Sequence, residues 1–221
     1  MMVSVVIPAY NEEKRIQATL KSVFLVDCVG EVIVVDDGSS DNTADLAEKA
    51  GAVVLKNKKN MGKGQALKSG LSMVNGDIIV FLDADVGEKA AEIKKLIRPV
   101  MTGEADMTIA RFPPARKKGG FGFVKALARW GVYIYTGKNI NCSLSGQRAF
   151  RREVMECIGN ISPGFGVEVG LTIDALKKGF SVMEVDVDMT HRETGRDLGG
   201  FAHRIRQFFN ILQVLIQRAV G

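Results

Sequence analysis

The sequence predicts an α/β fold in which helices cover both faces of a mostly parallel central sheet. Short β-branched runs alternate with stretches of helical period through the first half of the chain, and this alternation favours a parallel sheet. The strand-like runs are apolar throughout, as expected for strands buried on both faces. With 221 residues and no internal repeat or linker, we expect one domain over residues 1–221, with halves meeting near residue 110.

The first half of the chain is expected to alternate four strands with three helices. The strands are predicted at "VSVVIP", "EVIVVDD", "AVVLKN" and "DIIVFLDAD". The intervening helices are predicted at "EEKRIQATLKSVF", "NTADLAEKA" and "GKGQALKSGLSMV".

The second half is less regular. We expect a loop at "FPPARKKGGFG", residues 112–122, because it carries two prolines, three basic residues and three glycines. Further elements are predicted as helices at 88–101, 123–136, 166–178 and 201–219, and as strands at "ADMTIA", "GQRAFRR" and "SVMEVDVDM".

Composition excludes several classes of protein. No apolar run approaches the roughly 20 residues that span a bilayer, and the N-terminus lacks the features of a signal peptide, so a cytoplasmic location is expected. Cys28, Cys142 and Cys157 are odd in number and widely spaced, which indicates reduced, structural thiols. The net charge is +5, and the positively charged residues cluster in 111–152 and 192–206. This indicates anionic ligands, and not nucleic acid, because a long basic face with interleaved aromatics is missing.

The predicted terminal helix carries an apolar stripe with 4-3-4-3-4 spacing. We expect it to dock on the sheet of its own chain. Two alternatives stay open: a homodimer seam, or peripheral contact with an anionic membrane, since basic residues flank the stripe. The stripe consists of Phe201, Ile205, Phe208, Leu212, Leu215 and Ala219, and the flanking residues are His203, Arg204, Arg206 and Arg218.

Polar segments follow each strand of the first half, where ligands bind in open α/β sheets. In "DDGSSDNT", Asp36 and Asp37 could accept hydrogen bonds from a base or from ribose hydroxyls, whereas "GSSDNT" alone is explained by a turn and a helix capped by Asp41 or Asn42. "NMGKGQAL" lacks the Walker A spacing but can offer backbone N–H groups and one ammonium to a nucleotide.

The acids of "FLDAD" suit a metal site. Asp83 and Asp85 stand at i and i+2, so on a strand both side chains would face one side. Carboxylates suit Mg²⁺ or Mn²⁺, and magnesium favours few carboxylates together with substrate phosphates. A metal–diphosphate complex is therefore predicted here, the alternative being solvated acids in a turn.

Taken together, "VVIPAYNEE", "VIVVDDGSSDNT", "NMGKGQAL" and "FLDAD" resemble the nucleotide-sugar half of a family 2 glycosyltransferase of the GT-A fold. The resemblance implies a nucleotide-sugar half at about 1–110 and an acceptor half at about 111–221. It also implies that Asp85 binds the metal, that Asp83 helps to hold the ribose and that Lys63 closes on the nucleotide. The residues that it implies around the base and ribose are Pro8, Tyr10, Glu12 and Asp37.

Two relatives are similar to the second half. "LSGQRAFRREV" resembles the acceptor-side strand of dolichyl-phosphate mannose synthases, which implies acceptor contacts for Ser145 and Arg148. "GFGVEVGLTIDAL" and "MTHRETGRDL" are similar to glucosyl-3-phosphoglycerate synthases, which implies that Glu168 contacts the donor sugar and that His191 completes the metal shell. Both relatives use phosphorylated acceptors, so Arg111 and Arg129 are candidate phosphate ligands.

The predicted function is metal-dependent transfer of a hexose from a UDP- or GDP-sugar to a phosphorylated acceptor such as 3-phosphoglycerate. A polyprenyl phosphate at the membrane surface is the alternative acceptor. A sugar-phosphate nucleotidyltransferase is disfavoured because "PAYNEE" lacks a Gly-rich basic signature, and a non-catalytic nucleotide-sugar binding protein is a rival of another class. Stereochemistry and the general base stay open, with Glu168 as the available acid.

Overall fold

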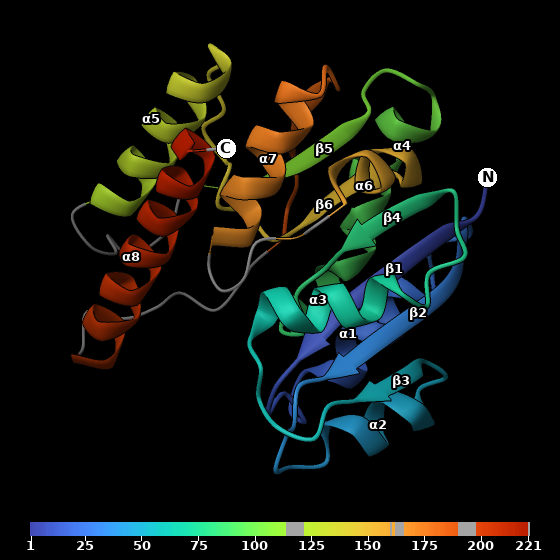
Figure 1. Cartoon of the computed structure of the whole chain (residues 1–221). Helices are drawn as coiled ribbons and strands as arrows, with labels where there is room; N and C mark the ends of the chain where they lie inside the picture. The colour runs from blue at the N-terminus through green and yellow to red at the C-terminus, as the bar shows by residue number, and fades with distance from the viewer. Residues whose placement is uncertain (114–121, 160, 162–165, 190–197, 221) are drawn as a thin grey trace.

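The computed structural model describes residues 1–113, 122–159, 161, 166–189 and 198–220, with only the backbone described at 198–204, 206, 219 and 220. Among these residues, seven strands form one sheet in the order β3-β2-β1-β4-β6-β5-β7. All neighbouring pairs are parallel except those of β6, which runs antiparallel to β4 and β5. The predicted α/β fold with a mostly parallel sheet is confirmed (Figure 1).

The elements follow one another from a regular first half into a more varied second half. The strands are β1 (Val3–Ala9), β2 (Val29–Asp36), β3 (Val53–Lys56), β4 (Ile78–Phe81), β5 (Met107–Arg111), β6 (Arg148–Arg151) and β7 (Val182–Asp186). The helices are α1 (Ile16–Val23), α2 (Thr43–Lys49), α3 (Lys63–Leu71), the 3₁₀ helix η1 (Gly87–Glu92), α4 (Ile93–Met101), α5 (Phe123–Thr136), α6 (Arg152–Ile158), α7 (Val167–Lys177) and α8 (Leu198–Val220).

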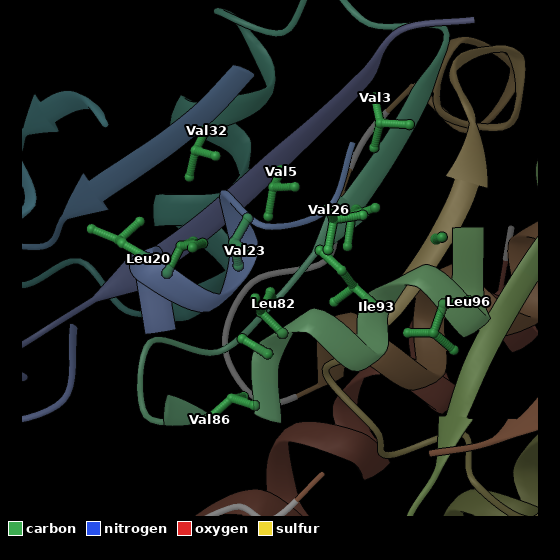
Figure 2. Close-up of a cluster of buried hydrophobic side chains, with 14 of the residues drawn as sticks. Val3, Val5, Leu20, Val23, Val26, Val32, Leu82, Val86, Ile93 and Leu96 are labelled. Carbon is green, nitrogen blue, oxygen red and sulfur yellow. The ribbon is translucent and has the colours of Figure 1, made fainter. Parts of the chain in front are cut away.

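Helices bury both faces of the sheet, because successive side chains of a strand point to opposite sides. Val5 of β1 faces α1 and α4, where it packs in a cluster with Leu20 and Ile93 (Figure 2). Its neighbour Val6 faces the other side and joins a cluster with Leu67 of α3 and Val132 of α5. Two apolar layers therefore hold the strands in place.

Strand β4 is shorter than predicted. It pairs with β6 only from Ile78 to Phe81, so Asp83 and Asp85 lie in the following turn and not on a strand. The alternation expected for i and i+2 on a strand therefore does not apply to them. The predicted helix at 88–101 is likewise divided into η1 and α4.

Helix α6 was not predicted from the sequence. The run "GQRAFRR" was expected to continue as a strand to Arg152, but β6 ends one residue earlier. Arg152 leaves the sheet because its backbone N–H donates to the Asp77 carbonyl at 2.9 Å and its guanidinium donates to the Gly76 carbonyl. The predicted loop at 112–122 falls mostly on residues 114–121, outside the described part of the chain.

Helix α8 packs against α5 and α7, and the residues that it buries there are Ile211, Val214 and Leu215. Of the predicted stripe, Leu215 is buried, Phe208 and Leu212 are half-buried, and Ile205 is exposed. The side chains of Phe201 and Ala219 lie outside the description. The buried face is therefore rotated away from the predicted stripe, since α8 docks on two helices.

No helix in the described part of the chain has the length and apolarity needed to cross a membrane. Cys28, Cys142 and Cys157 are all free thiols.

Candidate functional site

The carboxyl ends of β2, β1 and β4 lie side by side, because β1 pairs in parallel with both of the other strands. The segments that follow these strands therefore meet at one edge of the sheet. They are joined directly: the backbone N–H of Asp37, after β2, donates to the Ala9 carbonyl at the end of β1 at 2.8 Å. This edge is the candidate site.

Asp37 ties the segment before α3 to the end of β2. Its buried carboxylate accepts hydrogen bonds from the Asn57 amide at 2.8 Å, from the Met61 N–H at 3.0 Å and from the Gly62 N–H at 2.7 Å. Hydrogen bonds to a carboxylate are stronger than neutral ones. Asp37 thus fixes the start of α3, from which the next side chain, Lys63, reaches into the site.

The loop "PAYNEE" is held against the loop "GSSDNT". Asn11 adopts a left-handed conformation with φ of 54°, and its side-chain oxygen accepts from the Ser40 N–H at 2.9 Å. Asp41, and not Asn42, supplies the side-chain oxygen at the start of α2, accepting from the Thr43 N–H at 3.0 Å. Beside these bonds Tyr10 is 48% exposed, so its side chain is accessible to a ligand.

Lys63 joins the two halves of the chain. Its Nζ lies 2.7 Å from Asp83 Oδ1, after β4, and 3.0 Å from Glu168 Oε1, in the first turn of α7. Burial by itself would lower the pKa of Lys63, but the charges of Asp83 and Glu168 outweigh it and raise that pKa above its usual value. Gln147 donates its amide to Asp83 Oδ2 at 2.7 Å. Both oxygens of Asp83 therefore have protein partners.

Arg148 holds the wall behind Glu168. Its guanidinium is fully buried and donates to the carbonyls of Ser145 at 2.7 Å and of Glu168 at 3.1 Å. Burial lowers the pKa of Arg148 to about 10, although the charges of Glu168 and Asp83 oppose this shift. Arg148 thus positions the first turn of α7, and its predicted contact with the acceptor stays a prediction. Ser145 is also buried, with its hydroxyl 3.4 Å from Gln147 Oε1.

The turn that carries Asp85 is fastened to α1. Thr19 is buried and donates its hydroxyl to the Ala84 carbonyl at 2.7 Å, while it accepts from the Gly87 N–H at 2.8 Å. The guanidinium of Arg15 donates to the Asp85 carbonyl at 3.2 Å. The backbone before, at and after Asp85 is therefore fastened by Thr19 and Arg15, and Asp85 is held half-buried at the edge of the site.

The donor set at this edge fits a magnesium-like cation. Among the described residues there is no cluster of three or more histidine, cysteine or acidic side chains, and the oxygens of Asp83 are bound by Lys63 and Gln147. Asp85, in the turn after β4, is the carboxylate that the sequence predicts as the metal ligand. One carboxylate with substrate phosphates is the arrangement that Mg²⁺ favours. His191, the second predicted ligand, lies outside the described residues.

Comparison with known proteins identifies the family. The model of "Glycosyl transferase family 2" matches residues 4–159. The chain belongs to glycosyl transferase family 2. The predicted resemblance is confirmed, and with it the enzyme class.

Relatives of this glycosyltransferase include enzymes with different acceptors. It is 33% identical over 199 residues to glucosyl-3-phosphoglycerate synthase of Mycobacterium tuberculosis, covering 80% of this chain but only 61% of that protein. It is 30% identical over 228 residues to undecaprenyl-phosphate 4-deoxy-4-formamido-L-arabinose transferase of Serratia proteamaculans, covering 97% of this chain and 66% of that one. The chain thus spans about three fifths to two thirds of the length of these two relatives.

Solved structures confirm the GT-A fold. A crystal structure of the Mycobacterium tuberculosis synthase with Mn²⁺, UDP and phosphoglyceric acid has a TM-score of 0.81 and 30% identity, and the match covers 98% of this chain and 78% of that one. Another structure of the same enzyme contains Mg²⁺ and UDP. The metals bound by this neighbour are the two that were predicted for the glycosyltransferase.

Two predicted acceptor residues lie on elements other than those that carry Lys63 and Asp83. Arg111 ends β5, and its exposed guanidinium forms a two-pronged ion pair with Asp186 of β7, with Nη2 at 2.7 Å from Oδ2. The pair holds the pKa of Asp186 below its usual value. Arg129 is exposed on α5, where it borders a hollow of about 510 Å³ beside Trp130 and Tyr133.

Sequence reasoning missed Gln147 and Thr19 of the glycosyltransferase. Gln147 lies inside the quoted motif "LSGQRAFRREV", directly before β6, so its place at a strand end was the signal that could have found it. Thr19 gave no such signal, since a threonine inside an amphipathic helix is ordinary. Only the packing of α1 against the turn at 84–87 reveals its role.

Proposed function

We propose that this glycosyltransferase moves a hexose from a nucleoside-diphosphate sugar to a phosphorylated acceptor such as 3-phosphoglycerate, with Mg²⁺ or Mn²⁺ bound. The observation that carries the proposal is the contact of Lys63 with Asp83 on the donor side and Glu168 on the acceptor side. The ammonium of Lys63 bridges two acids at the carboxyl edge of the sheet. This arrangement suits a substrate whose diphosphate and sugar lie across that edge. The neighbour crystallised with Mn²⁺, UDP and phosphoglyceric acid supports the same pairing of ligands.

The donor nucleotide is assigned to the ends of β1 and β2. Pro8 and the exposed ring of Tyr10 would face the base, and Glu12 and Asp37 would lie next to the ribose. In the structure the Asp37 carboxylate already accepts hydrogen bonds from three donors of its own chain, on Asn57, Met61 and Gly62. Its first task is therefore to shape this pocket, and any bond to the nucleotide adds to those.

Transfer breaks the bond between the anomeric carbon and the diphosphate oxygen, so negative charge develops on the leaving group. A metal held by Asp85 and, as the family resemblance implies, by His191 would supply Lewis-acid stabilisation of that charge. Lys63 contacts both acids, and it would orient Asp83 toward the ribose and Glu168 toward the sugar. Glu168 would bind a sugar hydroxyl or take the acceptor proton, and an ionised phosphate acceptor would need no base.

The acceptor side is assigned to Arg111 and Arg129, since guanidinium groups bind phosphate with paired hydrogen bonds. Arg111 would exchange its partner Asp186 for the acceptor phosphate. A polyprenyl phosphate is the second candidate acceptor, because a relative that matches 97% of this chain is named for an undecaprenyl-phosphate substrate. Both acceptors present a phosphate to the same arginines.

A donor–acceptor screen tests the proposal. The purified protein is incubated with Mg²⁺ or Mn²⁺, with UDP- and GDP-hexoses, and with 3-phosphoglycerate or a short polyprenyl phosphate, and products are measured by mass spectrometry. We expect a glycosylated acceptor, its loss with a chelator, and its restoration by added metal. Binding of donors without turnover under every metal would instead indicate a non-catalytic binding protein.

The variant Asp85→Asn tests the assignment of Asp85 to the metal. We expect it to lose product formation by at least roughly a hundredfold, as is typical when charge stabilisation at a leaving group is removed, while the folded structure is retained. Asp45→Asn is the control, because Asp45 is exposed on α2 and pairs only at the surface with Lys56. Full activity of Asp85→Asn would contradict the metal assignment.

A further inference from the structure

The outward face of α5 is apolar. Phe123, Trp130, Tyr133 and Ile134 are all exposed, and Trp130 is 62% exposed. These residues lie on one side of the helix, whereas Ala128, Gly131 and Val132 on the other side are buried. An amphipathic helix on a surface exposed to water normally carries polar residues on its outward side.

Helix α8 repeats this arrangement. Ile205, Phe209 and Ile216 are exposed, and Phe209 is 62% exposed. Their spacing of four and seven residues puts them on one stripe, while Ile211 and Val214 are buried against the rest of the protein. The outward stripe is thus a second apolar surface, separate from the residues that dock the helix.

The two helices stand side by side (Figure 1). The Tyr135 hydroxyl donates to the Leu215 carbonyl at 2.7 Å. Gly131 lets the helices approach closely, because a Cβ there would lie 2.6 Å from Leu215 Cδ2. We call the exposed residues Phe123, Trp130, Tyr133, Ile134, Ile205, Phe209 and Ile216 the α5–α8 surface. Contiguous exposed apolar surface of this kind marks an interaction site.

Charge decides which partner fits. Neither α5 nor α8 contains an aspartate or a glutamate, whereas α5 carries Lys125 and Arg129 and is followed by Lys138, and these three side chains are exposed. A second copy of the chain would bring basic residues against basic residues with no acid of either helix to pair with them. An anionic lipid surface complements both the apolar stripe and the basic flank.

We propose that the α5–α8 surface docks this protein on an anionic membrane. The exposed aromatic residues enter the interfacial layer, where a ring that is apolar at one end and polar at the other is favoured. Lys125 and Lys138 lie at the level of the lipid headgroups. The docking is peripheral, through the faces of two helices that lie in the membrane surface.

The chain contains a single tryptophan, Trp130, and it lies on the proposed surface. Its fluorescence therefore reports docking without any label. Vesicles of phosphatidylcholine with about a third of phosphatidylglycerol should shift its emission to the blue, and brominated acyl chains in the same vesicles should quench it. Pure phosphatidylcholine should bind at least roughly tenfold more weakly, as should the anionic vesicles in high salt.

Ile134→Ser and Phe209→Ser test the apolar contacts. Each should weaken binding to anionic vesicles by several fold, measured by Trp130 emission and by flotation, because each removes exposed apolar area from the surface. Leu25→Ser is the matched control: Leu25 is 77% exposed and follows the C-cap of α1, and its removal should leave binding unchanged. Both test variants are surface changes, and circular dichroism checks their folding.

Three outcomes would overturn the proposal. One is an emission spectrum that no vesicle changes. Another is equal binding to neutral and anionic vesicles. The third is a blue shift that follows protein concentration in the absence of lipid, with a dimer mass in sedimentation that Phe209→Ser abolishes, since a second copy would then cover the surface.

Discussion

At position 146 a methyl group would lie 2.4 Å from Lys63 Nζ and 3.0 Å from Asp83 Oδ2. Glycine is therefore required there by space, not by backbone conformation. It lets the ammonium of Lys63 sit between Asp83 and Glu168 while Gln147 closes the other side of Asp83. A single missing side chain thus decides how the acids of the site are arranged.

Gly146→Ala should displace Lys63 and lower kcat/KM for the nucleotide sugar by at least roughly tenfold, because small misplacements of site residues are costly. The unfolding midpoint should change little, since the atom that must move is the end of a flexible side chain. Gly30→Ala is the control: its Cβ would lie 2.4 Å from the Met2 side chain, at the start of β2 and away from the site. Equal activity losses in both variants would contradict the assignment.

At the scale of elements, α1 organises the site from beneath. Thr19 bonds the Ala84 carbonyl and the Gly87 N–H, and Ser22 bonds the Glu88 carbonyl and the Ala91 N–H at 2.6 and 2.8 Å. Two hydroxyls one helical turn apart therefore fasten the turn of Asp85 and the following 3₁₀ helix η1. The helix that was predicted from periodicity alone also supports the turn of Asp85, the proposed metal ligand.

Thr19→Val keeps the shape of the side chain but leaves the buried Ala84 carbonyl and the partly buried Gly87 N–H without their partner. We expect a loss of about 1–3 kcal/mol in the free energy of unfolding, together with a rise in the Mn²⁺ concentration needed for half-maximal activity. Ser22→Ala should also destabilise the protein, but its bonds lie beyond Asp85, so the metal requirement should stay near that of the wild type. Denaturant titration and metal titration separate the two effects, and a metal requirement unchanged in Thr19→Val would contradict the role of α1.

At the scale of the molecule, the edge of the sheet opposite the site holds the second half together. Asp106, before β5, accepts from the Ser181 N–H at 2.8 Å and from the Arg151 guanidinium, which joins the starts of β5 and β7 to the end of β6. Burial alone would raise the pKa of Asp106, but these hydrogen bonds and the charge of Arg151 outweigh it and lower that pKa below 3.8.

The lowered pKa predicts a pH dependence of stability. A carboxyl group whose pKa is lower in the folded state stabilises that state above its unfolded pKa, and the contribution disappears as the pH falls through the folded value. Asp106→Asn should therefore be less stable than the wild type at pH 7, and the difference should shrink once the pH falls below 3.8. Thermal unfolding from pH 7 to pH 2.5 measures this, and a difference that is constant with pH would contradict it.

The sequence by itself determined the α/β fold, the family and the residues at the strand ends, because periodicity and short motifs are local. Asp37, Lys63, Asp83 and Asp85 were all predicted to lie at one edge, and the parallel order of β2, β1 and β4 puts their segments there. The acceptor-side residues were less predictable, since Arg111 pairs with Asp186 and Arg129 lies on the outward side of α5.

Only the tertiary structure decided which polar atoms meet. Lys63, Asp83 and Glu168 are far apart in sequence. The packing of α3, the turn after β4 and α7 brings a carboxylate oxygen of each acid within 3.0 Å of Lys63 Nζ. The same packing buries Arg148, which sequence placed at the acceptor, and exposes the apolar faces of α5 and α8. Local sequence sets the hydrophobic period of an element. Its rotation and its neighbours, however, follow from the packing arrangement that minimises the free energy of the whole core.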